Sequence, residues 1–150
     1  MSDALASSNQ AYSITRSLCA GGVYFAGVFA LGFALGMVRA LMTAPAIGEF
    51  AAVLLEIPIL LIASWFTAKW CVALFSVPPG GAERLTMGFV AFSLTMVAEL
   101  ALSVILFGQT VSEHVATYTH FIRLVGFAAQ LVFAVIPYVQ NEPRSRTPRL

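Results

Sequence analysis

Charged residues are scarce in this sequence. Of its 150 residues only 8 are Lys or Arg and 7 are Asp or Glu, whereas 59% are hydrophobic. A soluble domain carries roughly 25% charged residues, and a chain with so few cannot cover a water-facing surface in the usual way. The net charge of +1 also lacks the concentrated basic patch that nucleic acid requires. We therefore expect a lipid bilayer around the chain and no nucleic-acid partner.

The motifs of common catalytic and cofactor sites are missing as well. Cys19 and Cys71 stand alone, and the sequence contains no CxxC, HExxH, GxSxG or P-loop pattern. No histidine lies in the middle of an apolar run, which argues against a bis-histidine haem. We expect no cofactor, and the lack of an evident nucleophile with a base argues against an enzyme.

Metal ligands are represented only by a weak group. Glu113, His114 and His120 cluster around the connection between the third and fourth apolar runs, and Glu49 is expected on the same side. Two histidines six residues apart do not share a helix face, so one helix cannot present both to a metal. We therefore expect no metal site.

Four long apolar runs make up most of the chain. They cover about residues 17–42, 49–75, 85–107 and 118–139. Each exceeds the ~20 residues that cross a bilayer as a helix, and in lipid a helix satisfies its own backbone. The sequence predicts an all-α integral membrane four-helix bundle with up-down-up-down topology. Residues 1–150 form a single transmembrane domain in this prediction, and residues 140–150 form a flexible cytoplasmic tail.

Proline and glycine mark the connections between the runs. The segment TAPAIG (residues 43–48) is predicted to make the first turn, with Pro45 near a helix start. The segment VPPGG (residues 77–81) is the clearest loop. Inside the second run, Pro58 removes a hydrogen bond to Leu54 and is predicted to kink the helix. The polar residues 1–16 do not resemble a cleavable signal and are expected to form a short, partly helical lead-in.

Basic residues lie mostly on one side of the predicted bundle. Four spans place both termini and the second connection on the same side. Of the eight basic residues only Arg39 and Arg123 fall on the other side. The remaining six are Arg16, Lys69, Arg84, Arg144, Arg146 and Arg149. The positive-inside rule then predicts that both termini are cytoplasmic, in a bacterial-type inner membrane.

The first predicted helix is rich in small residues. One face repeats at i,i+4, and Gly32 and Gly36 form a GxxxG pattern on another face. The repeat consists of Gly22, Ala26, Ala30 and Ala34. Small residues let helix backbones approach closely, which drives association in lipid. Packing within the bundle is the first interpretation, and contact with a second copy or with a partner membrane protein is the second.

The most informative charged residues inside the predicted spans are Arg39, Glu56, Glu99 and Arg123. A charge at the bilayer centre costs at least ~2.5–3.5 kcal/mol on insertion scales, so such residues usually face the protein interior. At ~1.5 Å per residue, both glutamates lie about 10–12 Å below the outer boundary, and both arginines lie nearer to it. We expect these groups to meet in one neutral, buried cluster in the outer leaflet.

Polar residues at helical spacing extend this candidate site. Glu49 and Glu56 are i,i+7 in the second span, and Arg123 and Gln130 are i,i+7 in the fourth. The third span has an i,i+4 line formed by Thr95, Glu99 and Ser103. Residues at these spacings share one face of a helix, and we expect those faces to point at the bundle axis.

Three functions remain open on this evidence. The first is a non-enzymatic structural or partner subunit whose Arg and Glu side chains hold four helices in register. The second is a small proton- or ion-coupled transporter or binder, because a pair of arginines suits an anionic or amphipathic ligand. The third is a membrane enzyme that acts on a lipidic substrate.

Overall fold

This computed structural model describes residues 2–140, and almost all of them are helical. Side chains are described from residue 10 onward, except that of Phe107. The elements are α1 (Ser2–Val38), a π-helical turn η1 (Arg39–Thr43), α2 (Ala44–Ile47), α3 (Glu49–Leu74), α4 (Gly81–Phe107), α5 (Val111–Ala116), a 3₁₀ turn η2 (Thr117–Thr119) and α6 (Phe121–Val139). The predicted tail lies outside these residues, apart from Gln140.

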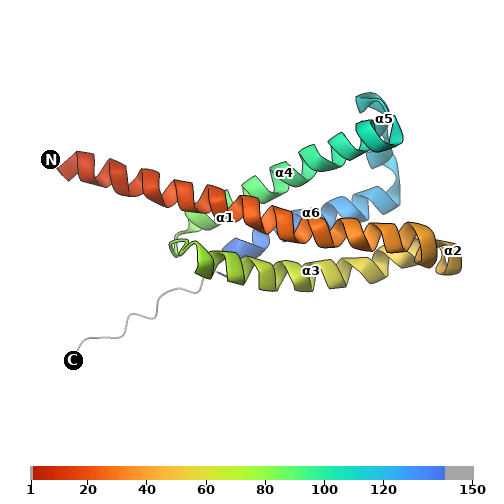
Figure 1. Cartoon of the computed structure of the whole chain (residues 1–150), viewed down its shortest axis with the longest axis horizontal. Coiled ribbons are helices and arrows are strands. Elements are labelled where there is room, and N and C mark those ends of the chain that lie inside the picture. Colours follow the sequence, from red (N-terminus) through yellow and green to blue (C-terminus); the bar gives the residue numbers. More distant parts are fainter. Residues whose placement is uncertain (1, 141–150) are drawn as a thin grey trace.

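Four of these segments are long and apolar enough to cross a membrane: Gln10–Ile47, Glu49–Leu74, Gly81–Leu106 and Phe121–Val139. They run up, down, up and down, so that the start of α1, the α3–α4 connection and the end of α6 lie at one end of the molecule, here called the termini end (Figure 1). The prediction of an all-α bundle of four apolar helices is confirmed. These features indicate a multi-pass membrane protein.

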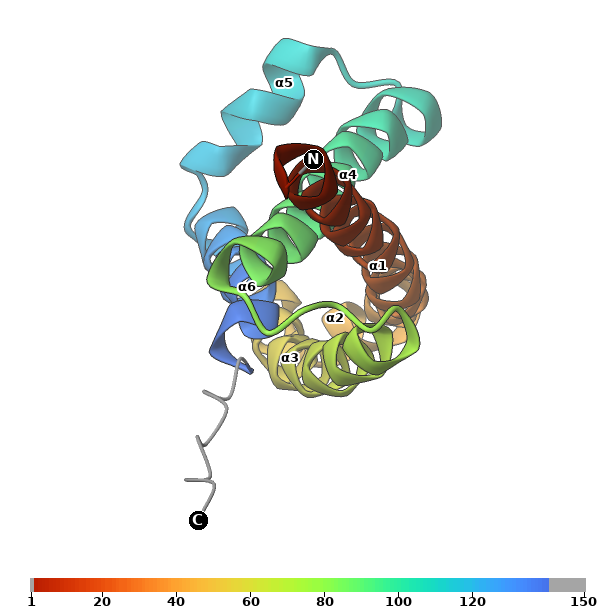
Figure 2. The same cartoon turned by 90° about the vertical axis from the view of Figure 1, so that its left-hand side faces the viewer.

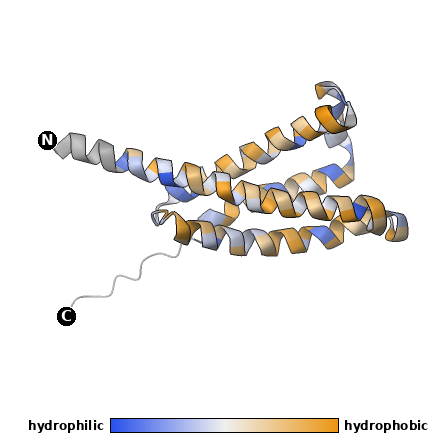
Figure 3. Ribbon diagram, viewed as in Figure 1, coloured by the Kyte–Doolittle hydropathy of each residue, from blue (hydrophilic) through white to orange (hydrophobic). Residues whose placement is uncertain are grey.

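The outer surface of the bundle is apolar. Figure 3 shows hydrophobic residues along much of the four long helices, with hydrophilic residues toward the start of α1 and at scattered positions elsewhere. Large side chains such as Phe66, Phe89 and Ile105 are each at least two-thirds exposed. Exposed apolar side chains on every long helix are what contact with acyl chains requires, because lipid offers no hydrogen bonds to a polar surface.

The helices form a ring in the order α1, α3, α6, α4 when seen along the bundle (Figure 2). Its packed core lies in the half nearer the termini end and consists of Ala20, Tyr24, Ala68, Cys71, Val77, Met87, Ala91, Phe133 and Ile136. Small residues allow this close approach. A Cβ at Gly21 would come within 2.7 Å of the Met87 carbonyl oxygen. A Cβ at Gly88 would overlap the carbonyl of Ala134 on α6.

The first connection differs from the prediction. The segment TAPAIG does not form a loop, because the helical path continues through η1 and α2 to Ile47 and turns at Gly48 alone, where φ is 84°. In η1 the Ala44 N–H donates to the Arg39 carbonyl, five residues back. This wider turn lies directly before Pro45, whose ring would clash with the carbonyl four residues earlier in a regular α-helix. Glycine suits the positive φ of the final turn.

The other predicted boundaries differ at their ends. Helix α1 starts at Ser2, so the polar lead-in is helical over its whole described length. Helix α3 continues through Pro58 as an α-helix, and the predicted kink stays a prediction. The fourth span begins at Phe121, because residues 111–119 form α5 and η2 instead. A capping box starts α5, with the Thr110 side chain accepting from the Glu113 N–H and the Glu113 carboxylate accepting from the Thr110 N–H.

Candidate functional site

A cavity of about 800 Å³ lies between the four long helices, in the half of the bundle away from the termini end. Helix α4 crosses α1 near Gly21 and then diverges from it toward the far end (Figures 1 and 2). Most of the lining is apolar, and the polar residues in it are Arg39, Glu49, Glu56, Ser64, Thr95, Glu99, Thr117, Tyr118, His120, Arg123 and Gln130. A volume of ~300–1,000 Å³ with few polar groups is typical of small-molecule sites.

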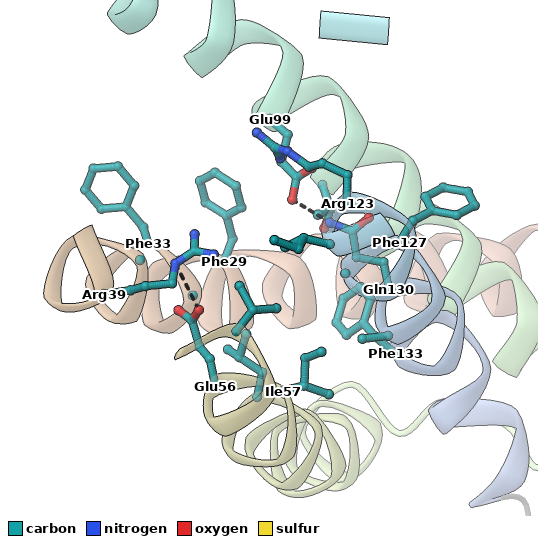
Figure 4. A pocket seen from close by; sticks show the side chains of 18 of the residues that line it. Phe29, Phe33, Arg39, Glu56, Ile57, Glu99, Arg123, Phe127, Gln130 and Phe133 are labelled. Atoms are coloured by element: carbon teal, nitrogen blue, oxygen red, sulfur yellow. Dashed lines mark hydrogen bonds and ion pairs between the residues drawn. The ribbon is translucent and has the colours of Figure 1, made fainter. Parts of the chain in front are cut away.

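One wall of the cavity, formed by α1 and α3, carries an ion pair. The Arg39 Nε lies 3.4 Å from the Glu56 Oε2, and their side chains are 34% and 13% exposed. Arg39 is the first residue of the π-helical turn, which shifts the register of the residues that follow it. The pair therefore joins the two helices on either side of the Gly48 turn (Figure 4).

The opposite wall, formed by α4 and α6, carries a hydrogen-bonded pair. The Gln130 Nε2 donates to the Glu99 Oε1, and the Gln130 Oε1 is buried without a partner in the described residues. Arg123 extends along the same wall beside Glu99 (Figure 4). No nitrogen of Arg123 lies within 4.0 Å of an acidic oxygen of the described residues. Its side chain is exposed toward the cavity mouth.

The four intramembrane charges thus form two groups on facing walls, which differs from the single buried cluster expected from the sequence. The reason is the order of the helices around the ring. Helix α3 neighbours α1 and α6 but not α4, so Glu56 and Glu99 lie on helices that do not touch. Each glutamate takes a partner from an adjacent helix, Arg39 for Glu56 and Gln130 for Glu99.

The remaining residues of the predicted polar lines have different positions. Glu49 is exposed at the cavity mouth, and Thr95 lines the cavity while its hydroxyl donates to the Ala91 carbonyl. Ser103 lies outside the cavity and donates to the Gln109 side chain. The cavity therefore includes only some of the polar residues that helical spacing placed on the inner faces of the helices.

Tyr118 is a cavity residue that sequence reasoning missed. It lies in η2, and its ring contacts both Phe127 and His114 edge-on. Burial, and then the negative charge of Glu99, raise the pKa of Tyr118, while Arg123 acts in the opposite direction. Tyr118 therefore lies close enough to Glu99 and Arg123 for their charges to affect it. The signal in the sequence was weak, because Tyr118 was assigned to the start of the fourth span, predicted at about residues 118–139.

The weak metal candidates do not come together. Glu113 is occupied by the capping box, and His114 is buried against Tyr118 with its Nδ1 unpartnered in the described residues. His120 points to the cavity instead. Within the described chain no group of three or more His, Cys, Asp or Glu side chains is close enough to hold a metal ion.

The small residues of α1 fall into two groups. Gly32 and Gly36 line the cavity. Along the other face, Ala26, Ala30 and Ala34 are exposed, and a Cβ at Gly22 would meet nothing within 4 Å. The interpretation that this repeat packs inside the bundle is therefore wrong, whereas Gly21 beside it does make a close helix contact.

Comparisons with known protein families, curated proteins and solved structures give no match to this chain. Chemical interpretation of the cavity therefore depends on its own residues. Guanidinium groups bind oxyanions through paired hydrogen bonds, and the apolar lining suits a hydrocarbon portion. The cavity combines guanidinium groups with an apolar lining.

Proposed function

We propose that this protein binds an amphipathic anion in the cavity between its four helices. The observation that carries the proposal is the combination of Arg123 without an ion-pair partner in the described residues and a lining that is otherwise mostly apolar. The polar group of the ligand pairs with Arg123 at the mouth. The hydrocarbon part lies along Phe29, Leu60 and Phe133, where each buried CH₂ contributes about 0.8 kcal/mol.

The proposed location is a bacterial-type inner membrane with both termini in the cytoplasm. This orientation rests on the distribution of basic residues, which favours the termini end. The cavity then opens in the outer leaflet. A binder in this position delivers or removes a lipid-like anion, and coupling to a proton through Glu99 extends the same proposal to transport.

Two glycines offer a matched test. A side chain at Gly126 would project into the cavity, and a Cβ at Gly126 or Gly22 meets no atom within 4 Å. Gly22 lies outside the cavity, and both glycines are helical, so Leu at either position gains helix propensity equally. Only Gly126→Leu places its added side chain inside the cavity.

The experiment measures binding of a fluorescent single-chain fatty acid to the protein in phosphatidylcholine vesicles. The proposal expects saturable binding to the native protein and to Gly22→Leu, and at least tenfold weaker binding to Gly126→Leu, with equal thermal stability of the two variants. Equal binding to all three proteins, or none to the native protein, contradicts the proposal.

A structural or partner subunit is the second candidate, and the Arg39–Glu56 pair favours it. This pair joins α1 to α3 and needs no ligand. Under that proposal Glu99 and Arg123 act in the same way, so neutralising either lowers stability, and neutralising both recovers part of the loss. Under ligand binding, Arg123→Gln leaves thermal stability nearly unchanged and weakens binding.

A further inference from the structure

Gln130 holds the Glu99 carboxylate deep in the cavity. The Gln130 Nε2 donates to the Glu99 Oε1, and Arg123 lies seven residues earlier on the same face of α6. At ~1.5 Å per residue, the two Cα positions on α6 are about 10 Å apart along the axis. The backbone of Arg123 therefore lies about two turns of α6 from that of Gln130, whose side chain holds the acid. Arg123 approaches it closely enough to influence it but forms no ion pair with it.

The first turn of α6 adds hydrogen-bond donors beside Arg123. His120 precedes this helix with an extended backbone, and its side chain makes no capping hydrogen bond. His120, Ile122 and Arg123 all line the cavity. The first N–H groups of a helix have no partner within the helix and carry a partial positive charge. The Arg123 guanidinium and the first N–H groups of α6 thus belong to the same end of this helix, and both favour an oxyanion.

Apolar residues border the side of the cavity between α1 and α4. Phe33 and Met37 on α1 are 46% and 52% exposed, and Leu106 on α4 is 59% exposed, while all three also line the cavity. Both helices are long and apolar enough to cross a membrane. An opening with such edges leads to acyl chains more readily than to water, because a water-filled entrance favours polar edges.

Arg39 differs from Arg123 in its partner. Its Nε is taken up by Glu56, which neutralises its charge on the wall of α1 and α3. Glu99 has no arginine of the described residues within ion-pair distance, and its hydrogen bond comes from Gln130 instead. An amide satisfies the carboxylate oxygen without neutralising its charge and without engaging Arg123. The wall of α1 and α3 therefore holds an ion pair, whereas the wall of α4 and α6 holds its glutamate through an amide.

We propose that Arg123, with the first turn of α6, binds the phosphate or carboxylate head group of a membrane amphiphile that enters between α1 and α4, and that Gln130 is the positioning residue that keeps Glu99 from pairing with Arg123. This inference rests on the function proposed above and names the residues and the ligand class. The amphiphile enters from the bilayer, head group toward the α5 side of the molecule.

The test compares two ligands with the same acyl chain, fluorescent lysophosphatidate and lysophosphatidylcholine, in phosphatidylcholine vesicles that contain the full-length protein. The variants are Arg123→Gln, Gln130→Leu and the double variant Gln130→Leu with Glu99→Gln. Lys69→Gln is the control, because it removes one positive charge from an exposed position outside the cavity. Thermal unfolding of each variant is recorded in the same vesicles.

Arg123→Gln is expected to weaken lysophosphatidate binding by about 10–100-fold, as loss of a hydrogen bond to a charged group implies, and to change lysophosphatidylcholine binding by less than about threefold. Gln130→Leu is expected to give a similar loss, because the released Glu99 can then pair with Arg123. Adding Glu99→Gln restores lysophosphatidate binding. This recovery distinguishes a positioning role from damage to the fold, which a second substitution would not repair.

Several outcomes overturn the inference. If Arg123→Gln retains native affinity for lysophosphatidate while Gly126→Leu still abolishes binding, Arg123 is not the anion site and the proposed function survives. If the double variant binds as weakly as Gln130→Leu, the positioning role fails. If inorganic phosphate displaces lysophosphatidate at an equal concentration, the ligand is a water-soluble anion. If the native protein binds neither lipid, the proposed function falls as well.

Discussion

At the scale of single residues, Tyr24 and Pro137 act on the same backbone atom from different helices. Pro137 has no N–H, so the carbonyl of Phe133, four residues earlier, has no donor within α6. The Tyr24 hydroxyl on α1 donates to this carbonyl at 3.0 Å, and the Tyr24 side chain is fully buried. A proline that weakens one helix thereby creates a hydrogen-bond site for another, which fixes α1 against α6 at the core.

Tyr24→Phe is therefore expected to cost about 1–3 kcal/mol of unfolding free energy, because it leaves a buried carbonyl unsatisfied. In a Pro137→Ala background the same change should cost less, since the N–H of residue 137 then supplies the donor. The measurement is thermal unfolding of the four proteins in detergent. Equal costs in both backgrounds would show that the hydroxyl and the proline are not coupled.

The Arg39–Glu56 pair allows a second prediction at this scale. Arg39→Gln and Glu56→Gln should each lower the unfolding free energy by about 1–3 kcal/mol, between the values for exposed and fully buried pairs, because the pair is partly exposed. The double change should recover part of the loss. A thermal unfolding cycle measures the coupling, and additive losses would mean that the two side chains do not interact.

At the scale of helices, close approach of α4 and α6 depends on Gly88. Ala at this position would overlap the Ala134 carbonyl, so Gly88→Ala is expected to cost at least about 1–3 kcal/mol or to separate the helices. Gly22→Ala is the control, because its Cβ meets nothing within 4 Å and should stabilise the helix by up to about 1 kcal/mol. Unfolding in detergent compares them, and equal stability would contradict the packing.

The short helix α5 has a pH-dependent start. Hydrogen bonds from the Thr110 N–H and hydroxyl hold the pKa of Glu113 below its ordinary value of 4.5. A lowered folded-state pKa means that this stabilisation is present above pH 4.5 and is lost as the pH falls through the folded-state value. Backbone amides of residues 110–116 should therefore exchange faster as the pH falls below 4.5, after correction for intrinsic rates, and Glu113→Gln, which has no carboxyl group to titrate, should remove the dependence.

Element positions were largely predictable from the sequence, and their ends were not. Apolar length alone located the four long helices, because lipid requires about 20 apolar residues per span. The helical path through Pro45 was missed, because it depends on the π-helical turn at residues 39–43. The spacing of hydrophobic residues does not predict such a turn. The capping box that begins at Thr110 has the T-x-x-E pattern that marks a helix start, but it lies between the predicted third and fourth spans, where no helix was expected.

At the scale of the whole molecule, small residues close the bundle in one half and charges occupy the cavity in the other. Gly21, Gly88 and Ala91 allow tight packing toward the termini end, whereas the helices diverge beyond it. The sequence identified four charged residues that line the cavity but placed them in one cluster. Their separation onto two walls follows from the order of helices around the ring, and single-sequence patterns do not encode that order.

We propose that the space between the diverging helices holds a membrane amphiphile. The most direct measurement is a cryo-electron microscopy map of the full-length protein in lipid nanodiscs, with the cavity volume and its contents compared between native protein and Gly126→Leu. We predict elongated non-protein density in the native cavity, with its polar end at Arg123 and its chain along Phe29 and Phe133, and no such density in the variant. A structure in which α4 closes against α1, or in which the cavity holds only water, would contradict the binding of an amphiphile there.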